Sequence, residues 1–190
     1  MAIKIRVLDL IDYEPPLDAH HTLIAPTVEE INEYWRNRTA KPIPDKQFGL
    51  IAWTTFADPT LAPPGKHVLN LTMMGVYRLN KSNWDEEKPR FIESVINYLS
   101  DGILPGLKDH VQVADAATPL DFERRIGLGE GAIYGLAQNF TTGTIFRPAN
   151  KSKSIKGLYL VGSSTNPGGG VPTVIASGAI TANLIAKFEK

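Results

Sequence analysis

The chain has 190 residues and no cysteine, and 20 lysine and arginine residues balance 20 aspartate and glutamate residues. Charges of both signs are spread along the sequence, which excludes the electrostatic footprint of a nucleic-acid-binding protein. The lack of thiols excludes disulfides, cysteine nucleophiles and thiolate metal sites, so any redox chemistry must come from a cofactor. This length is typical of one domain, and we expect residues 1–190 to form a single unit.

The amino-terminal stretch IKIRVLDL (3–10) alternates apolar and charged residues, which predicts a half-buried strand ended by Pro15 and Pro16. The first sixteen residues lack the uninterrupted apolar core of a signal peptide, so a cytoplasmic location is expected. Thr27 and Glu30 form a capping box, which predicts a short helix over 28–37.

Two segments rich in apolar, β-branched and aromatic residues, 48–56 and 67–77, flank a loop with three prolines and a glycine. They are predicted to pair as antiparallel strands. Asn83 is predicted to cap a helix with one apolar stripe, made of Ile92, Val95, Ile96 and Leu99. Asp101 to Gly106 ends this helix, and 111–117 is predicted to be another strand.

From 118 to 150 the chain is rich in glycine and shows no clean period, which predicts a long loop that lines a site. The expected fold class is α+β. It consists of a mainly antiparallel sheet with flanking helices, built from the strands near Ile3, Phe48, His67 and Val111.

The segment 157–186 contains no charged residue, but Pro167, the glycines at 168–170 and Pro172 interrupt it. Only about fifteen apolar-leaning residues follow, against roughly twenty that a bilayer requires. We therefore expect protein interior and no transmembrane span, with peripheral membrane contact left open.

The same segment has the order of a buried strand (Leu158–Val161), a glycine-rich turn and a helix. Glycines let the backbone approach a ligand closely, and Pro172 fixes the start of the helix. Because a helix amino terminus offers unpaired N–H groups and partial positive charge, it can hold a phosphate or the electron-rich edge of a flavin. A tight connection between a core strand and a core helix fits the pattern as well, and the pattern alone leaves both interpretations open.

The sequence GLYLVGSSTNPGGGVPTVIASGAITANLI resembles the carboxyl-terminal signature of the phytoene desaturase family of FAD-dependent oxidoreductases, which are flavoproteins of carotenoid biosynthesis in the amine oxidase superfamily. Three upstream stretches, DPTLAPPGKHVLNL, TPLDFERRIGLGEGAIYGL and IFRPANKSKSIKGLYLVG, resemble that family in the same order. The resemblance covers most of the chain from about Asp58 onward.

This resemblance implies an FAD-dependent desaturase, isomerase or saturase that acts on a long apolar polyene or isoprenoid. It also implies that residues 1–117 are strands and helices like those of a substrate domain, and that 118–190 is the carboxyl-terminal, flavin-facing segment. Its implied cofactor-binding residues are Gly162, Ser163, Gly169, Gly170, Val171 and Thr173. Ser163 occupies the place where many related flavoproteins have a ribityl-binding acid, and Arg147 is the polar candidate for substrate binding. No catalytic residue is assigned.

The family also has a βαβ unit bearing G-x-G-x-x-G for the ADP part of FAD, which nothing in these 190 residues supplies. A separate amino-terminal FAD-binding chain is therefore an expected partner, and the isolated chain is expected to be inactive. We also expect homo-oligomers that cover an exposed apolar surface. The alternative is a non-catalytic binding or assembly module that kept the fold and lost the cofactor.

The remaining polar residues give weaker signals. The four histidines show no metal-ligand spacing, so no metal is predicted. Asp121, Glu123, Arg124 and Arg125 fit a solvated turn or an ion pair better than acid–base chemistry.

Overall fold

The computed structural model describes residues 2–11, 15–17, 20–38, 43–44, 46–137, 139–143 and 146–189. The chain separates into two compact units, unit 1 (Met1–Gly131) and unit 2 (Ala132–Lys190). The division predicted from the sequence, between 117 and 118, lies upstream of this boundary. The substrate-facing and flavin-facing roles of the two segments remain predictions.

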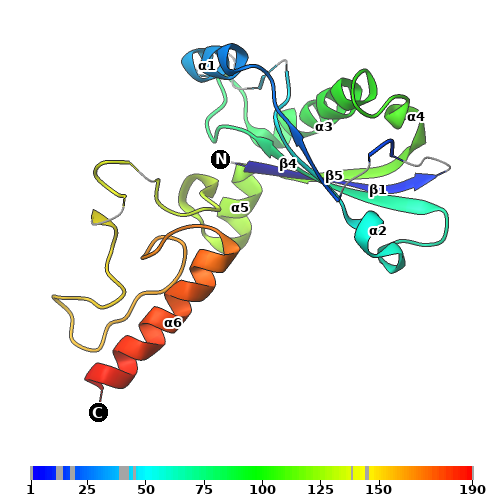
Figure 1. Cartoon of the computed structure of the whole chain (residues 1–190). Helices are drawn as coiled ribbons and strands as arrows, with labels where there is room; N and C mark the ends of the chain where they lie inside the picture. Colours follow the sequence, from blue (N-terminus) through cyan, green and yellow to red (C-terminus); the bar gives the residue numbers. More distant parts are fainter. Residues whose placement is uncertain are drawn as a thin grey trace. The chain divides into compact units, whose positions relative to one another are not determined.

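Unit 1 is built on one five-stranded antiparallel sheet in the order β2-β3-β4-β1-β5 (Figure 1). Its strands are β1 (Ala2–Ile11), β2 (His21–Ile24), β3 (Gly49–Trp53), β4 (Lys66–Met74) and β5 (Val111–Ala117). All four predicted strands of this sheet are confirmed, as is the α+β fold class. The sequence reading missed β2 and extended β3 too far, because Thr54–Ala57 forms the short helix α2. The predicted half-burial of β1 concerns side chains outside those that the structure describes.

Helix α3 (Trp84–Ser100) and the short α4 (Leu107–His110) lie on one face of the sheet (Figure 1). Asn83 caps α3 as predicted, because its side-chain oxygen accepts from the amides of Asp85 at 2.9 Å and Glu86 at 3.1 Å. The buried stripe of α3 consists of Trp84, Phe91, Val95 and Leu99. The predicted stripe was therefore displaced, since Ile92 and Ile96 flank the buried line and Phe91 belongs to it.

Two capping boxes fix helix starts in unit 1. The predicted one, between Thr27 and Glu30, begins α1 (Val28–Asn37). A second, between Thr118 and Asp121, begins α5 (Pro119–Ile126), which ends at Gly127 in the left-handed conformation. The prediction that 118–150 is loop throughout is therefore wrong in its first part. Beyond α5 comes a single 3-10 turn, η2 (Gly129–Gly131).

Unit 2 consists of loops and one long helix, α6 (Val171–Phe188), among its described residues. The predicted strand Leu158–Val161 is not formed, because only an isolated bridge joins Tyr159 to Lys151. It is not buried either, since Leu158 is 37% exposed and Val161 is 59% exposed. Four apolar residues predict a buried strand only where neighbouring strands exist to receive them.

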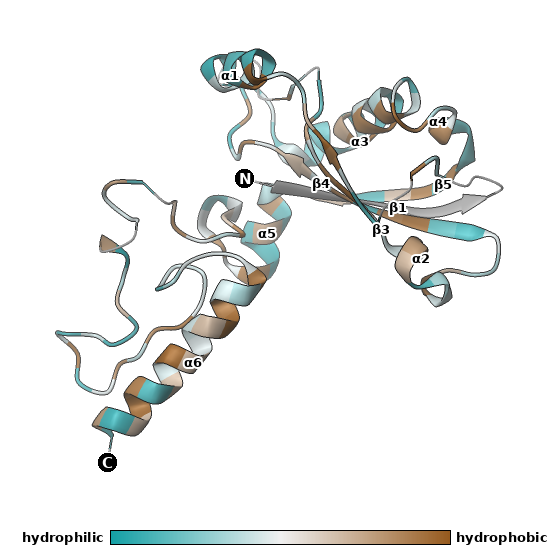
Figure 2. Cartoon of the chain, viewed as in Figure 1, coloured by the Kyte–Doolittle hydropathy of each residue, from teal (hydrophilic) through white to brown (hydrophobic). Residues whose placement is uncertain are grey.

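The burial of α6 is opposite to that of an ordinary amphipathic helix. Its buried residues are the polar Ser177 and Thr181. Its exposed large apolar residues are Val171, Ile175, Ile180, Ile185 and Phe188, and Figure 2 shows this apolar character along the helix. The expectation that α6 is covered on most sides is not met by the described residues. By length and composition alone α6 could cross a membrane, but one helix of this kind is weak evidence for a membrane span.

Candidate functional site

A buried polar cluster, rather than an apolar core, holds α6 against the loops of unit 2. The side-chain nitrogen Nδ2 of Asn150 lies 3.0 Å from Ser177 Oγ and 3.1 Å from Thr181 Oγ1. The Ser177 and Thr165 hydroxyl oxygens are 2.9 Å apart. All four residues are buried. We call Asn150, Thr165, Ser177 and Thr181 the polar hub. Because its groups satisfy one another, the polar face of α6 faces inward and its apolar residues remain outside.

Arg147 is a second buried polar group, and only 4% of it is exposed. Its Nε donates to the Thr165 carbonyl at 2.9 Å, and its Nη2 donates to the carbonyls of Leu136 and Ser163. Its Nη1 lies 3.4 Å from the Thr142 carbonyl. The guanidinium thus joins the loop at 136–142 to the loop at 163–165. Substrate binding by Arg147 stays a prediction, although its donors are engaged with the backbone.

The backbone carbonyls of the turn between 160 and 170 are held by side chains of unit 2. The Leu160 and Asn166 carbonyls accept from Asn150, and the Ser163 and Thr165 carbonyls accept from Arg147. The Gly162 carbonyl accepts from the Thr165 hydroxyl at 3.0 Å. Since C=O and N–H point in opposite directions in a trans peptide, the Ser164 and Asn166 N–H groups, which share peptide units with the Ser163 and Thr165 carbonyls, are directed away from Arg147. The Asn166 carbonyl precedes Pro167, which has no N–H.

The glycines of this turn have two different functions. Gly162 (φ 120°) and Gly170 (φ 114°) have backbone conformations that L side chains rarely adopt. Gly169 is needed for close packing instead, because a Cβ there would lie 2.4 Å from the Tyr134 carbonyl oxygen. Likewise a Cβ on Gly135 would lie 2.8 Å from the Ser163 carbonyl carbon. The predicted ligand approach therefore suits Gly162 and Gly170, whereas Gly169 packs against its own unit.

The amino terminus of α6 presents unpaired donors. Gly170 is its N-cap, no described side chain caps the helix, and Pro172 stands in the first turn. Among the described residues, no hydrogen bond is made by the amides of Val171 and Thr173. The Thr173 hydroxyl donates at 2.8 Å to the carbonyls of both Gly169 and Gly170. These contacts turn the carbonyls toward the helix and leave the N–H groups for a ligand.

This arrangement fits an electron-rich, planar ligand edge such as the pyrimidine side of a flavin. Several backbone donors and a helix amino terminus lie in one turn, and Gly170 adds no Cβ in front of them. Ser163 lies in the same turn, with its carbonyl held by Arg147. We call residues 162–173 the donor turn. All six residues assigned from sequence lie in it, and Gly169 packs against the Tyr134 carbonyl.

The cluster at Asp121, Glu123 and Arg124 serves structure. The Asp121 carboxylate accepts from the Thr118 amide at 2.8 Å, and that of Glu123 accepts from the Tyr77 hydroxyl. Arg124 makes a two-pronged ion pair with Asp85 at 2.8 and 2.9 Å. The interpretation as a solvated turn with ion pairs agrees with these contacts.

Sequence reasoning missed the polar hub altogether. Asn150 follows FRPA, while Ser177 and Thr181 stand four residues apart in a helix that otherwise reads as apolar. That spacing places the two hydroxyls on one helical face, and it was the available signal.

Curated relatives match nearly the whole chain. A lycopene-forming phytoene desaturase of Paracoccus sp. (strain N81106 / MBIC 01143) is 30% identical over 178 residues, which is 90% of this chain and 34% of that protein. A second, of Pseudescherichia vulneris, is 32% identical over 171 residues, 88% of this chain and 34% of that protein. A 4,4'-diaponeurosporene oxygenase of Staphylococcus haemolyticus is 31% identical over 179 residues, 94% of this chain and 36% of that protein. The chain thus spans about a third of the length of these relatives. No protein-family model matches it.

Proposed function

We propose that this chain, which belongs to the phytoene desaturase family, forms the flavin-facing part of an FAD-dependent oxidoreductase. It matches about a third of the length of its relatives in that family. The proposed substrate is a long apolar polyene or isoprenoid, in keeping with the names of the relatives. A part that binds the ADP portion of FAD, in the same or a separate chain, would complete the site.

The observation that carries this proposal is the donor turn of unit 2. Arg147 and Asn150 hold its carbonyls, and the N–H groups of Val171 and Thr173 remain without partners among the described residues. When bound, FAD would accept a hydride or electrons from the substrate, and negative charge would build on its pyrimidine edge. Backbone donors at a helix amino terminus stabilise such charge without any titratable side chain.

The apolar outer face of α6 supports the view that unit 2 needs a cover. Exposed Ile175 and Ile180 alternate with buried Ser177 and Thr181 along one helix. Large apolar residues exposed together on one helix are seldom left bare in water. We propose that the dinucleotide-binding part covers this face, and that copies of the chain associate through it when that part is absent.

The second candidate function is a non-catalytic binding or assembly module. The same exposed apolar face of α6 favours it, because such a face would serve assembly without any cofactor. The two functions differ in whether the donor turn contacts flavin. A cytoplasmic setting is part of either proposal.

Flavin absorbance after gel filtration tests the proposal. The chain alone should bind FAD weakly or not at all, because immobilising a large ligand costs at least several kcal/mol and the ADP anchor is absent from these residues. Coexpression with the part of the Paracoccus phytoene desaturase that precedes the matched third should give a copurifying yellow complex. A chain that purifies alone with stoichiometric FAD would overturn the half-site argument.

Gly170→Leu should abolish the yellow colour of that complex, because φ 114° disfavours leucine and the new Cβ would lie 3.1 Å from Thr173 Oγ1. Gly157→Leu is the matched control, since Gly157 also has positive φ (74°) but has nothing within 4 Å of its Cβ position. Equal FAD binding by the Gly170→Leu complex would place the cofactor elsewhere.

A further inference from the structure

The charge of Arg147 is buried, and no carboxylate among the described residues forms an ion pair with it. Its hydrogen-bond partners among the described residues are four backbone carbonyls, those of Leu136, Thr142, Ser163 and Thr165. A buried guanidinium is stable there only because several carbonyl dipoles point at it together. The side chain therefore constrains the peptide units that supply those carbonyls.

Two of those peptide units lie in the donor turn. The Ser163 carbonyl shares its peptide plane with the Ser164 N–H, and the Thr165 carbonyl shares its plane with the Asn166 N–H. Because C=O and N–H are antiparallel in a trans peptide, both amides point away from Arg147. Neither amide donates a hydrogen bond to any described residue. Fixing the carbonyls thus aims two free donors outward.

We propose that Arg147 is a positioning residue which holds the Ser164 and Asn166 amides as a second pair of flavin contacts, beside those of Val171 and Thr173. This inference rests on the proposed function and deepens it. In this role Arg147 orients the backbone of the turn by binding its carbonyls, and it does not contact substrate directly.

The chemistry of this contact requires arginine. Nε and Nη2 lie in one rigid plane and reach the Thr165 and Ser163 carbonyls together. Lysine carries its three donors on a single atom and cannot hold two loops in this fork geometry. Arg147→Lys therefore keeps the positive charge and loses the orientation of the two peptide units.

The test is an amide NMR titration with FAD of the isotopically labelled chain, combined with the unlabelled part of the Paracoccus phytoene desaturase that precedes the matched third, because the proposed function expects FAD to bind to that complex. In the wild type the amides of Ser164, Asn166, Val171 and Thr173 should all shift. In Arg147→Lys the affinity should fall about tenfold, which corresponds to one lost charge-assisted hydrogen bond. The shifts of Ser164 and Asn166 should fall most.

Two comparisons separate positioning from general damage. Arg124→Lys makes the same substitution in an exposed ion pair of unit 1 and should leave the titration unchanged. Resonances of Ser177 and Thr181 report whether the polar hub remains folded in Arg147→Lys.

The amides distinguish this inference from the proposed function. If Val171 and Thr173 shift with FAD in the complex but Ser164 and Asn166 do not, the second pair of contacts is refuted while the proposed function stands. If none of the four shifts, the proposed function fails as well. If all four shift equally in wild type and Arg147→Lys, Arg147 does not position the turn.

Discussion

Replacing Asn150 by alanine should destabilise unit 2 strongly without affecting unit 1. The Asn150 amide nitrogen has two hydrogens and lies 3.0 to 3.4 Å from five acceptors, including Ser177 Oγ, Thr181 Oγ1 and the Asn166 carbonyl. The two hydroxyls have other partners, whereas the Asn166 carbonyl accepts from no other described residue. Two lost hydrogen bonds at about 1 kcal/mol each, and one orphaned carbonyl at about 1 to 2 kcal/mol, give a loss of about 3 to 4 kcal/mol.

Hydrogen exchange of the α6 amides measures this loss locally. About 3 to 4 kcal/mol corresponds to a roughly 150- to 900-fold faster exchange when exchange requires opening of the helix. The matched control is Asn183→Ala on the exposed side of α6, which should slow exchange slightly because alanine favours helix. Exchange in α6 that stays within a few-fold of wild type in Asn150→Ala would refute the polar hub as the element that holds α6.

Three further predictions concern unit 1. Phe91→Ala should lower its free energy of unfolding by about 3 to 5 kcal/mol in denaturant titrations, because Phe91 is fully buried and packs edge-on against Trp84. Burial of Asp121 raises its pKa, but hydrogen bonds from Thr118 outweigh this effect and hold the pKa below 3.8. The stability that the ionised carboxylate contributes above pH 3.8 should therefore be lost as the pH falls further. The Asp121→Asn variant should not show this loss. Burial raises the pKa of Tyr34 from 10.0 to about 12. Ultraviolet absorbance should therefore show one tyrosine that ionises late, and the free energy of unfolding should fall between these two pH values. Ionisation of Tyr34 near pH 10 would contradict this prediction.

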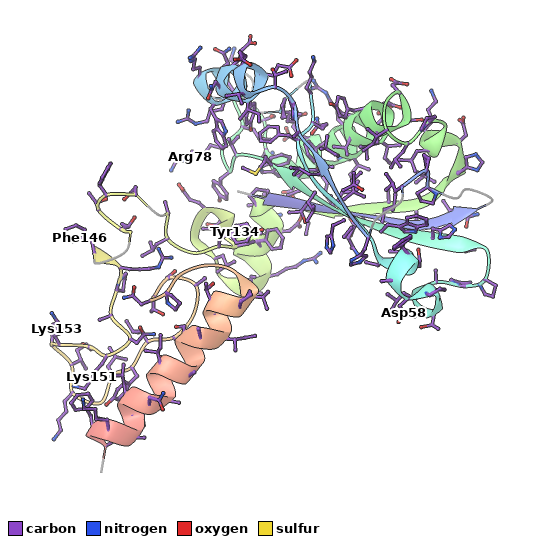
Figure 3. The ribbon with its side chains drawn as sticks, viewed as in Figure 1. Asp58, Arg78, Tyr134, Phe146, Lys151 and Lys153 are labelled. Atoms are coloured by element: carbon purple, nitrogen blue, oxygen red, sulfur yellow. The ribbon has the colours of Figure 1, made fainter. Side chains whose placement is uncertain are left out.

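Other polar contacts at the surface should matter less. The ammonium of half-buried Lys151 lies 4.5 Å from the ring centre of exposed Phe188, at the carboxyl-terminal end of α6 (Figure 3). Exposed contacts of this kind stabilise by about 0.5 to 1 kcal/mol, so they cannot replace the polar hub.

The sequence by itself determined most of unit 1. Alternation in 3–10, the capping box at Thr27 and the cap at Asn83 are local signals, and each depends on residues within a few positions of one another. The glycine-rich turn and the helix after it were visible for the same reason. The family followed from motifs that lie in order along the chain, which relatives now confirm over about nine-tenths of its length.

Only the tertiary structure decided the character of unit 2. Leu158 to Val161 has the composition of a buried strand, yet a strand needs neighbours for its backbone hydrogen bonds, and the described chain provides an isolated bridge. Arg147 gave no local sign that its partners would be the carbonyls of Leu136 and Ser163, residues 11 and 16 positions away. Which face of α6 is buried was equally undetermined by local pattern, because Asn150 selects the hydroxyl side from 27 to 31 residues away. Burial depends on which surfaces meet in space, and a sequence window contains only one of the two.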